Sequence, residues 1–311
     1  MTLFSPMSFF ATPLGVRVGA GLAAVATAGG FAFGWLPHTI YIDKYKEVVQ
    51  FYQNGFPGKL DDKIQRRARK ALLDVKINDR FKDHISFFQV ATLDPMFAGT
   101  PESGYGAILG IPATFAFESV EDVPIRELAL VGEPSAVSWE SPAGKLLKES
   151  FVFSDEAQRY AIAQHIYMAN SNHVTLNTVA SAGAVLNTYI TSRLFNKKLP
   201  SAPFWARCLI YSLCAAFNAS GYIYIKDMTT YTREKDALDR AIDLGPDYKR
   251  GAVQYYERLL VRNKALRVIL GKEGASKYTA RGNLNTLIRT PHFPLSAALD
   301  RAKSHEDEIE E

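Results

Sequence analysis

The chain has 311 residues, and its composition, 47% hydrophobic and 22% charged, allows a substantial buried core and excludes a disordered protein. The formal net charge of +4 is too small an excess of basic residues to indicate a nucleic-acid-binding protein. The two cysteines, Cys208 and Cys214, lie in one apolar run, so neither a disulfide framework nor a cysteine-based zinc site is expected.

The first predicted element is a membrane-spanning helix inside the N-terminal segment 1–42. Residues 18–37 carry no charge, and a helix of this length covers about 30 Å, the thickness of the hydrocarbon core of a bilayer. A secretory signal peptide and a buried helix of a soluble protein are the alternatives. Its glycines, Gly15 with Gly19 and Gly30 with Gly34, have the four-residue spacing that lets helices approach closely in lipid.

A soluble α+β domain is predicted for residues 43–173. Helices are expected at 39–56 and 59–75. The second carries a basic cluster: Arg66, Arg67, Arg69 and Lys70. We interpret this cluster as a solvated helix face, and a contact with anionic lipid is the alternative. Short β-branched and aromatic stretches predict a small sheet, and a short helix follows it; the strands are expected at 85–93, 106–119 and 125–132, and the helix at 143–149. Ser154 to His173 then reads as one helix.

A transmembrane hairpin is predicted at 174–225, with spans at about 174–191 and 208–225. The loop 192–207 between them carries no acidic residue, and a basic loop between apolar helices marks the cytoplasmic or matrix side; its cations are Arg193, Lys197, Lys198 and Arg207. By alternation the N-terminus shares this side, whereas 39–173 and 226–311 lie on the other. Because the first span contains two asparagines, a buried soluble hairpin remains the alternative.

The C-terminal region 226–311 is predicted to be helical and to end in an acidic tail. Two helices are expected to end at Gly245 and Gly271, and a turn-rich loop follows the second. The fold class predicted from these elements is an α+β membrane protein, mostly helical, with three transmembrane helices and a small β-sheet domain between the first and second.

Six motifs, in collinear order over roughly residues 105–285, resemble the transmembrane protein 177 family: GIPATF (110–115), SPAG (141–144), EAQRYAIA (156–163), YYERLL (255–260), NKALR (263–267) and LGKEGASKYTARGN (270–283). The resemblance implies a multi-pass protein of the mitochondrial inner membrane that is not an enzyme and needs no cofactor. It further implies a role in early maturation and stability of cytochrome c oxidase subunit two, through contacts with that subunit and its membrane chaperone. Copper-delivery assembly factors are further candidate partners. In that location the basic loop faces the matrix, and the soluble parts lie in the intermembrane space.

The order of elements is also similar to that of membrane-bound zinc peptidases that carry H-E-x-x-H on a helix. In that register Gln164 and Met168 stand at the two ligand positions and His165 at the base position, and an amide and a thioether are poor zinc ligands. Glu234 could stand for the third ligand. His165 and His173 would lie about 12 Å apart along one regular helix, too far to share a metal.

We therefore expect no catalytic residue and no metal site on this helix, and we expect His165 to be a buried histidine with one hydrogen bond. The groove beside Gln164, His165 and Met168 is instead a candidate site for an extended polypeptide partner. An active or degenerate metallopeptidase of the H-E-x-x-H type is the alternative function, and a scaffold that binds lipid through 66–70 is a third.

Overall fold

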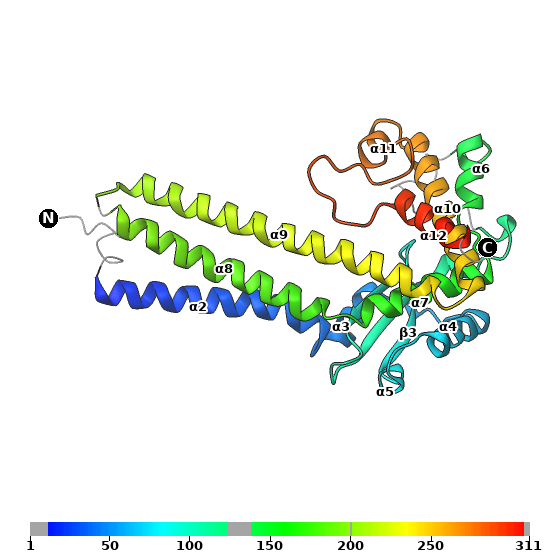
Figure 1. Ribbon diagram of the computed structural model, residues 1–311, viewed down its shortest axis with the longest axis horizontal. Helices are drawn as coiled ribbons and strands as arrows, with labels where there is room; N and C mark the ends of the chain where they lie inside the picture. Colours follow the sequence, from blue (N-terminus) through cyan, green and yellow to red (C-terminus); the bar gives the residue numbers. More distant parts are fainter. Residues whose placement is uncertain (1–11, 124–137, 200, 308–311) are drawn as a thin grey trace.

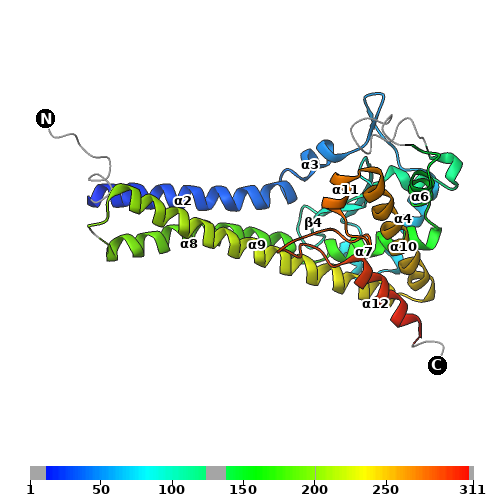
Figure 2. The same ribbon diagram turned by 90° about the horizontal axis from the view of Figure 1, so that it is seen from above.

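The computed structural model describes residues 12–123, 138–199 and 201–307, and the molecule is elongated (Figure 1). One half is a bundle of three long helices, α2 (Pro13–Trp35), α8 (His173–Lys198) and α9 (Phe204–Ile242). The other half holds the sheet and the remaining helices. Seen from above, α9 runs from the far end of the bundle into this second half (Figure 2), so the predicted third span and the helix after it are one continuous element.

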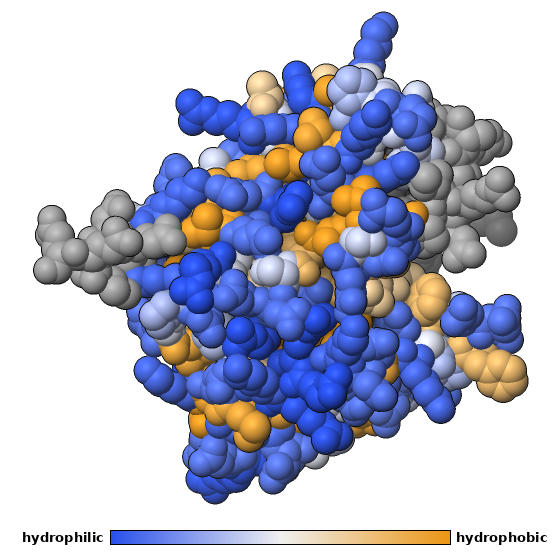
Figure 3. Space-filling model, turned by 90° about the vertical axis from the view of Figure 1, so that its right-hand side faces the viewer, coloured by the Kyte–Doolittle hydropathy of each residue, from blue (hydrophilic) through white to orange (hydrophobic). Residues whose placement is uncertain are grey.

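Two helical segments of the described chain are long and apolar enough to cross a membrane, Pro13–His38 and Phe204–Ile242. Large apolar side chains on both point outward; Val25 is 71% exposed and Phe217 is 77% exposed. A core helix of a soluble protein would bury such residues, so the buried-helix alternative does not hold for these segments. By contrast, the face of the molecule that looks away from the bundle is mainly hydrophilic (Figure 3).

Glycine allows α2 to pack closely on α8, as the glycine spacing predicts. A Cβ added to Gly34 would lie 3.0 Å from Oγ1 of Thr178, and one added to Gly30 would lie 3.6 Å from Val185. Thr178 itself is fully buried. Small residues at such positions bring helix backbones into contact, which strengthens packing where lipid supplies no hydrophobic driving force.

The predicted sheet is present, with three strands: β3 (Ile85–Val90), β4 (Met96–Gly99) and β5 (Ala107–Pro112). β5 lies in the middle, parallel to β3 and antiparallel to β4. Every residue of β5 is buried, because helices cover both faces of the sheet. α7 (Asp155–Ala169) packs on one face, and α3 (Ile42–Val49) packs on the other. Because β5 lies between the other two strands, β4 is at an edge of the sheet, and it lies beside α7.

α7 is the central helix of this half, because residues 157–169 are all buried. Its N-cap is Ser154 as predicted, whose hydroxyl accepts from the amide of Ala157. A Cβ on Gly251 would overlap the carbonyl of Glu156, so α10 (Pro246–Ile269) crosses the start of α7 at backbone contact. The elements that complete the half are η1 (Leu36–His38), α4 (Asp62–Asp74), α5 (Asp79–Lys82), η2 (Ala113–Ala116), η3 (Val120–Asp122), α6 (Pro142–Glu149), α11 (Lys272–Lys277) and α12 (Leu295–Asp307).

Several predicted boundaries are wrong. The helix expected at 39–56 ends at Val49, and a hairpin follows, β1 (Tyr52–Gln53) and β2 (Phe56–Pro57), because Asn54 and Gly55 adopt the positive φ that a tight hairpin turn requires. The helix expected over 154–173 ends at Ala169. α11 lies within the loop expected after Gly271, and α12 lies within the region 226–311 that was expected to be helical, although no bounds were predicted for it. The strand expected at 125–132 lies outside the described residues.

Candidate functional site

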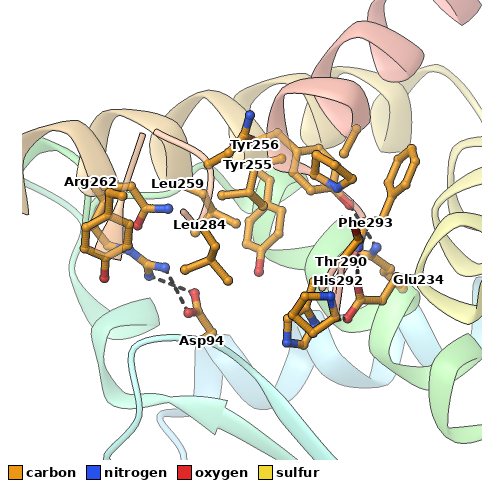
Figure 4. A pocket seen from close by; sticks show the side chains of 18 of the residues that line it. Asp94, Glu234, Tyr255, Tyr256, Leu259, Arg262, Leu284, Thr290, His292 and Phe293 are labelled. Atoms are coloured by element: carbon orange, nitrogen blue, oxygen red, sulfur yellow. Dashed lines mark hydrogen bonds and ion pairs between the residues drawn. The ribbon is translucent and has the colours of Figure 1, made fainter. Parts of the chain in front are cut away.

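A cavity of about 570 Å³ lies in the half of the molecule that holds the sheet, between α7, α10 and the end of α9 (Figure 4). Asp94 and Pro95, which precede β4, form one side of its rim. Residues 284–294, here called the C-terminal strap, form another wall. All three residues of the candidate groove line this cavity: Gln164, His165 and Met168. Glu234 of α9 lines it as well, so the structure brings together the four positions compared with a zinc peptidase.

Gln164 belongs to a buried network of neutral hydroxyl and amide groups. Its amide nitrogen donates to the hydroxyl of Tyr256 (2.8 Å), which also accepts from the hydroxyl of Tyr160 (3.0 Å). Burial raises the pKa of both tyrosines, so both hydroxyls stay protonated. Gln164 therefore connects α7 to α10 through a hydrogen bond, at a position where a peptidase would need an imidazole.

His165 is a buried histidine with a hydrogen bond to the backbone, as expected. Its ring is 9% exposed, and Nδ1 lies 2.7 Å from the carbonyl oxygen of Ala161, to which its N–H donates. Burial lowers the pKa of His165, so the neutral ring is favoured. The ring of Phe97 packs edge-on against both His165 and His173, with centroids 6.2 and 5.1 Å apart. The two histidines therefore do not face a common metal position.

Glu234 is held by the chain's own C-terminal strap. One carboxylate oxygen lies 2.6 Å from Nδ1 of His292, and the other accepts from the amide of Phe293 (2.7 Å). The carboxylate raises the pKa of His292. Both oxygens that could act as a third metal ligand are therefore engaged by the strap, and Figure 4 shows His292 and Phe293 beside Glu234.

Within the described ranges, no three side chains of His, Cys, Asp or Glu come close enough to share a metal ion. The donors that do line the cavity at the compared positions are an amide, a thioether and a carboxylate that already accepts two hydrogen bonds. Zinc in proteins favours imidazole and thiolate. The residues present therefore do not fit a zinc site of the peptidase type.

The far wall of the cavity depends on a buried arginine. Arg262 of α10 is 6% exposed and donates to both carboxylate oxygens of Asp94 (2.7 and 2.8 Å). Next to it, Asn263 donates to the carbonyl of Gly282 (2.7 Å). These bonds join the start of the edge strand and the loop after α11 to α10. Sequence reasoning missed these residues as parts of a site, although Asn263 and Tyr256 lie in two of the motifs that carried the family resemblance.

The basic residues of the predicted loop lie at the end of the bundle farthest from the cavity (Figure 1). Arg193, Lys197 and Lys198 belong to the end of α8, and Arg207 lies in the first turn of α9. In the separate cluster on α4, Arg67 donates to Gln158 and pairs with Asp155 of α7, so this residue has a structural role in packing.

Fold and site together define a membrane protein of helices and a small sheet, in which an outward apolar helical bundle is joined to a cavity-bearing half. Residues 52–311 match the family model of Transmembrane protein 177, and the chain belongs to this family. It is 29% identical to Transmembrane protein 177 of Danio rerio over 286 residues, 90% of this chain and 91% of the relative. The Homo sapiens relative is 28% identical over 286 residues, 90% of each chain. No solved structure is significantly similar to the chain.

Proposed function

We propose that this chain is a non-enzymatic assembly factor of the mitochondrial inner membrane, which supports early maturation and stability of cytochrome c oxidase subunit two and its membrane chaperone. Membership of the Transmembrane protein 177 family supports this role. The observation that carries the proposal is the cavity itself. At the positions compared with a peptidase site, its polar groups are engaged with other groups of the chain, which suits binding and not hydrolysis.

In this proposal α8 is a membrane span as well, in addition to α2 and α9. Residues 174–192 carry no charge and extend about 28 Å in a helix, which matches the uncharged stretches of α2 and α9 beside it. Its outer side chains are apolar; Val179 is 58% exposed and Leu194 is 57% exposed. Two of its polar side chains have partners in the bundle, since Asn187 donates to Asn218 of α9 (2.6 Å) and Thr188 donates to the carbonyl of Ala184.

The basic end of the bundle faces the matrix in this proposal, together with the N-terminus. The positive-inside rule supports this orientation, because loop 192–207 contains basic and no acidic residues. Residues 39–173 and 226–311 then lie in the intermembrane space. Protease protection of tagged termini, in intact mitochondria and in mitochondria with ruptured outer membranes, tests it. Both tags should be protected in intact organelles, and after rupture only the C-terminal tag should be cleaved; cleavage of the N-terminal tag would overturn the orientation.

The cavity is the proposed partner groove. β4 is an edge strand, and an extended polypeptide can add to such an edge through main-chain hydrogen bonds while its side chains enter adjacent pockets. The cavity also lies close to the bilayer: Glu234 is eight residues beyond Lys226, the first charged residue after the apolar stretch of α9, or about 12 Å along the helix. A newly inserted membrane subunit, or a copper-delivery factor acting on it, would be within reach.

Site-specific photocrosslinking tests the groove. A benzoylphenylalanine at Leu284, which lines the cavity and is 48% exposed, should crosslink to pulse-labelled subunit two in mitochondria. The matched control is the same probe at Leu73, which is 74% exposed on α4. Absence of the subunit-two adduct from Leu284, or an equal yield from Leu73, would overturn the groove assignment. Stoichiometric zinc in the purified protein, lost in a His165→Ala variant, would overturn the non-enzymatic role.

A further inference from the structure

The C-terminal strap carries two adjacent aliphatic residues that contact almost nothing in the chain. Leu287 is 100% exposed and Ile288 is 95% exposed, more than any other large hydrophobic residue outside the bundle. Single exposed aliphatic residues are common on protein surfaces, but two neighbouring ones at the tip of a segment form a small apolar surface. We call Leu287 and Ile288 the strap tip.

A bidentate ion pair places the strap tip at the membrane boundary. Arg289 donates through Nε and a terminal nitrogen to both carboxylate oxygens of Asp227, each at 2.8 Å. Asp227 and Lys226 are the first charged residues after the apolar stretch of α9. Because one residue spans at most about 3.6 Å of chain, Leu287 lies within about 7 Å of the Arg289 backbone. The tip is therefore close to the level at which α9 leaves the bilayer.

The overall arrangement agrees with this level. The strap extends from the soluble half toward the bundle and reaches α9, and both ribbon views show this (Figures 1 and 2). On the neighbouring span, α2 ends at Trp35, whose ring packs edge-on against Tyr105 with centroids 6.0 Å apart. Tryptophan and tyrosine are typical of the membrane–water interface.

We propose that the strap tip inserts into the lipid surface next to α9 and anchors the strap at the boundary between headgroups and acyl chains. Just before the charged residues at 226 and 227, α9 also exposes large apolar side chains, since Tyr224 and Ile225 are 67% and 47% exposed. The cation that follows the tip is neutralised by Asp227, so insertion does not require desolvation of an unpaired charge. The occupant is therefore lipid, and a protein that covers the tip is the competing outcome.

Lipid contact at the strap tip has a consequence for the cavity. Thr286 and Thr290, on either side of the tip, both line it, and His292 holds Glu234 two residues further on. A bilayer that holds the tip would therefore hold one wall of the cavity in place. This inference concerns the chain and lipid alone, and its test needs no partner protein.

Fluorescence quenching by spin-labelled lipid tests the anchor in the full-length protein reconstituted into vesicles. In a background without Cys208 and Cys214, an environment-sensitive probe is attached to Leu287→Cys or, separately, to Ile288→Cys. The aqueous control is Leu73→Cys on α4, and the membrane control is Val25→Cys, which is 71% exposed within α2.

Probes at the tip should emit at shorter wavelength than the probe at Leu73. They should lose most of their emission to a nitroxide placed high on the acyl chain, whereas the probe at Val25 should be quenched more by a deep nitroxide. If both tip probes behave like the Leu73 probe in vesicles of this protein alone, lipid is not the occupant and the proposal is overturned. Use of two tip positions keeps the test valid if one variant does not fold.

Discussion

The ion pair between Asp94 and Arg262 should respond very differently to the loss of each partner. Arg262 is buried, at 6% exposed, whereas the side chain of Asp94 is 52% exposed. Asp94→Asn leaves a buried guanidinium without its counter-charge, and removal of one partner of a buried pair typically costs 3–5 kcal/mol. Since Asp94 faces solvent on one side, we expect the lower end, about 3 kcal/mol. Arg262→Met leaves only a solvated carboxylate, and its cost should be about 1 kcal/mol.

These costs predict a measurable difference in melting temperature. At roughly 2–4 °C per kcal/mol for a folding unit of 150–250 residues, Asp94→Asn should lower the melting temperature of the half that holds the sheet by about 6–12 °C, and Arg262→Met by about 2–4 °C. Trp139 is buried in this half and reports its unfolding by fluorescence, once Trp35 and Trp205 of the bundle are replaced by phenylalanine.

The double variant separates charge from packing. Asp94→Asn combined with Arg262→Met removes both charges, so it should melt near Arg262→Met alone and well above Asp94→Asn. If Arg262→Met melts as low as Asp94→Asn, the loss of the arginine stem dominates, and the assignment of a buried, charge-dependent cavity wall is refuted. Far-UV circular dichroism before heating establishes that each variant is folded.

Two further predictions concern the strap and the bundle. Glu234 raises the folded-state pKa of His292, so the stability that this pair contributes is complete below pH 6.5, the usual pKa of histidine, and is lost as pH rises through the folded-state pKa. Hydrogen exchange of the strap amides, corrected for intrinsic rates, should accelerate over that pH range. His292→Gln should abolish this pH dependence, and an unchanged dependence would contradict the pairing. Gly34→Val should destabilise the bundle by about 1–3 kcal/mol in thermal unfolding, because the added Cβ meets Thr178. Gly29→Val is the control and should be neutral, because a Cβ at Gly29 has no neighbouring atom within 4 Å. Equal effects of the two variants would contradict the close packing of α2 on α8.

Elements whose residues carry a strong local signal could be predicted from the sequence. The uncharged stretch 18–37 and the N-cap at Ser154 depend on composition and on one side chain, and both correspond to helices in the structure. The break after Ala169 could not be predicted in this way. It occurs at Asn170, Ser171 and Asn172, and these residue types are only weakly unfavourable in a helix. The helix ends there because α8 must change direction to pack along α2.

The site was predictable only on the helix where sequence comparison gave a register. Gln164, His165 and Met168 all line the cavity, because positions that share one face of α7 remain together however the rest of the chain folds. The opposite walls come from Asp94, 168 residues before Arg262, and from the C-terminal strap. No local pattern encodes such long-range pairs, and the strap has the turn-rich, proline-containing sequence of a surface segment.

The polar groups of the cavity that the sequence comparison singled out each bind another part of the chain itself. At the compared positions, the amide of Gln164 donates to Tyr256, the ring of His165 bonds its own helix, and the carboxylate of Glu234 binds the strap. Gln164 and His165 are buried, so their bonds satisfy polar groups that would otherwise be costly to bury, and the partly exposed carboxylate of Glu234 holds the strap in place. A polypeptide that enters from the edge of β4 would therefore compete with the strap, and the strength of the strap contacts would set how readily the groove opens.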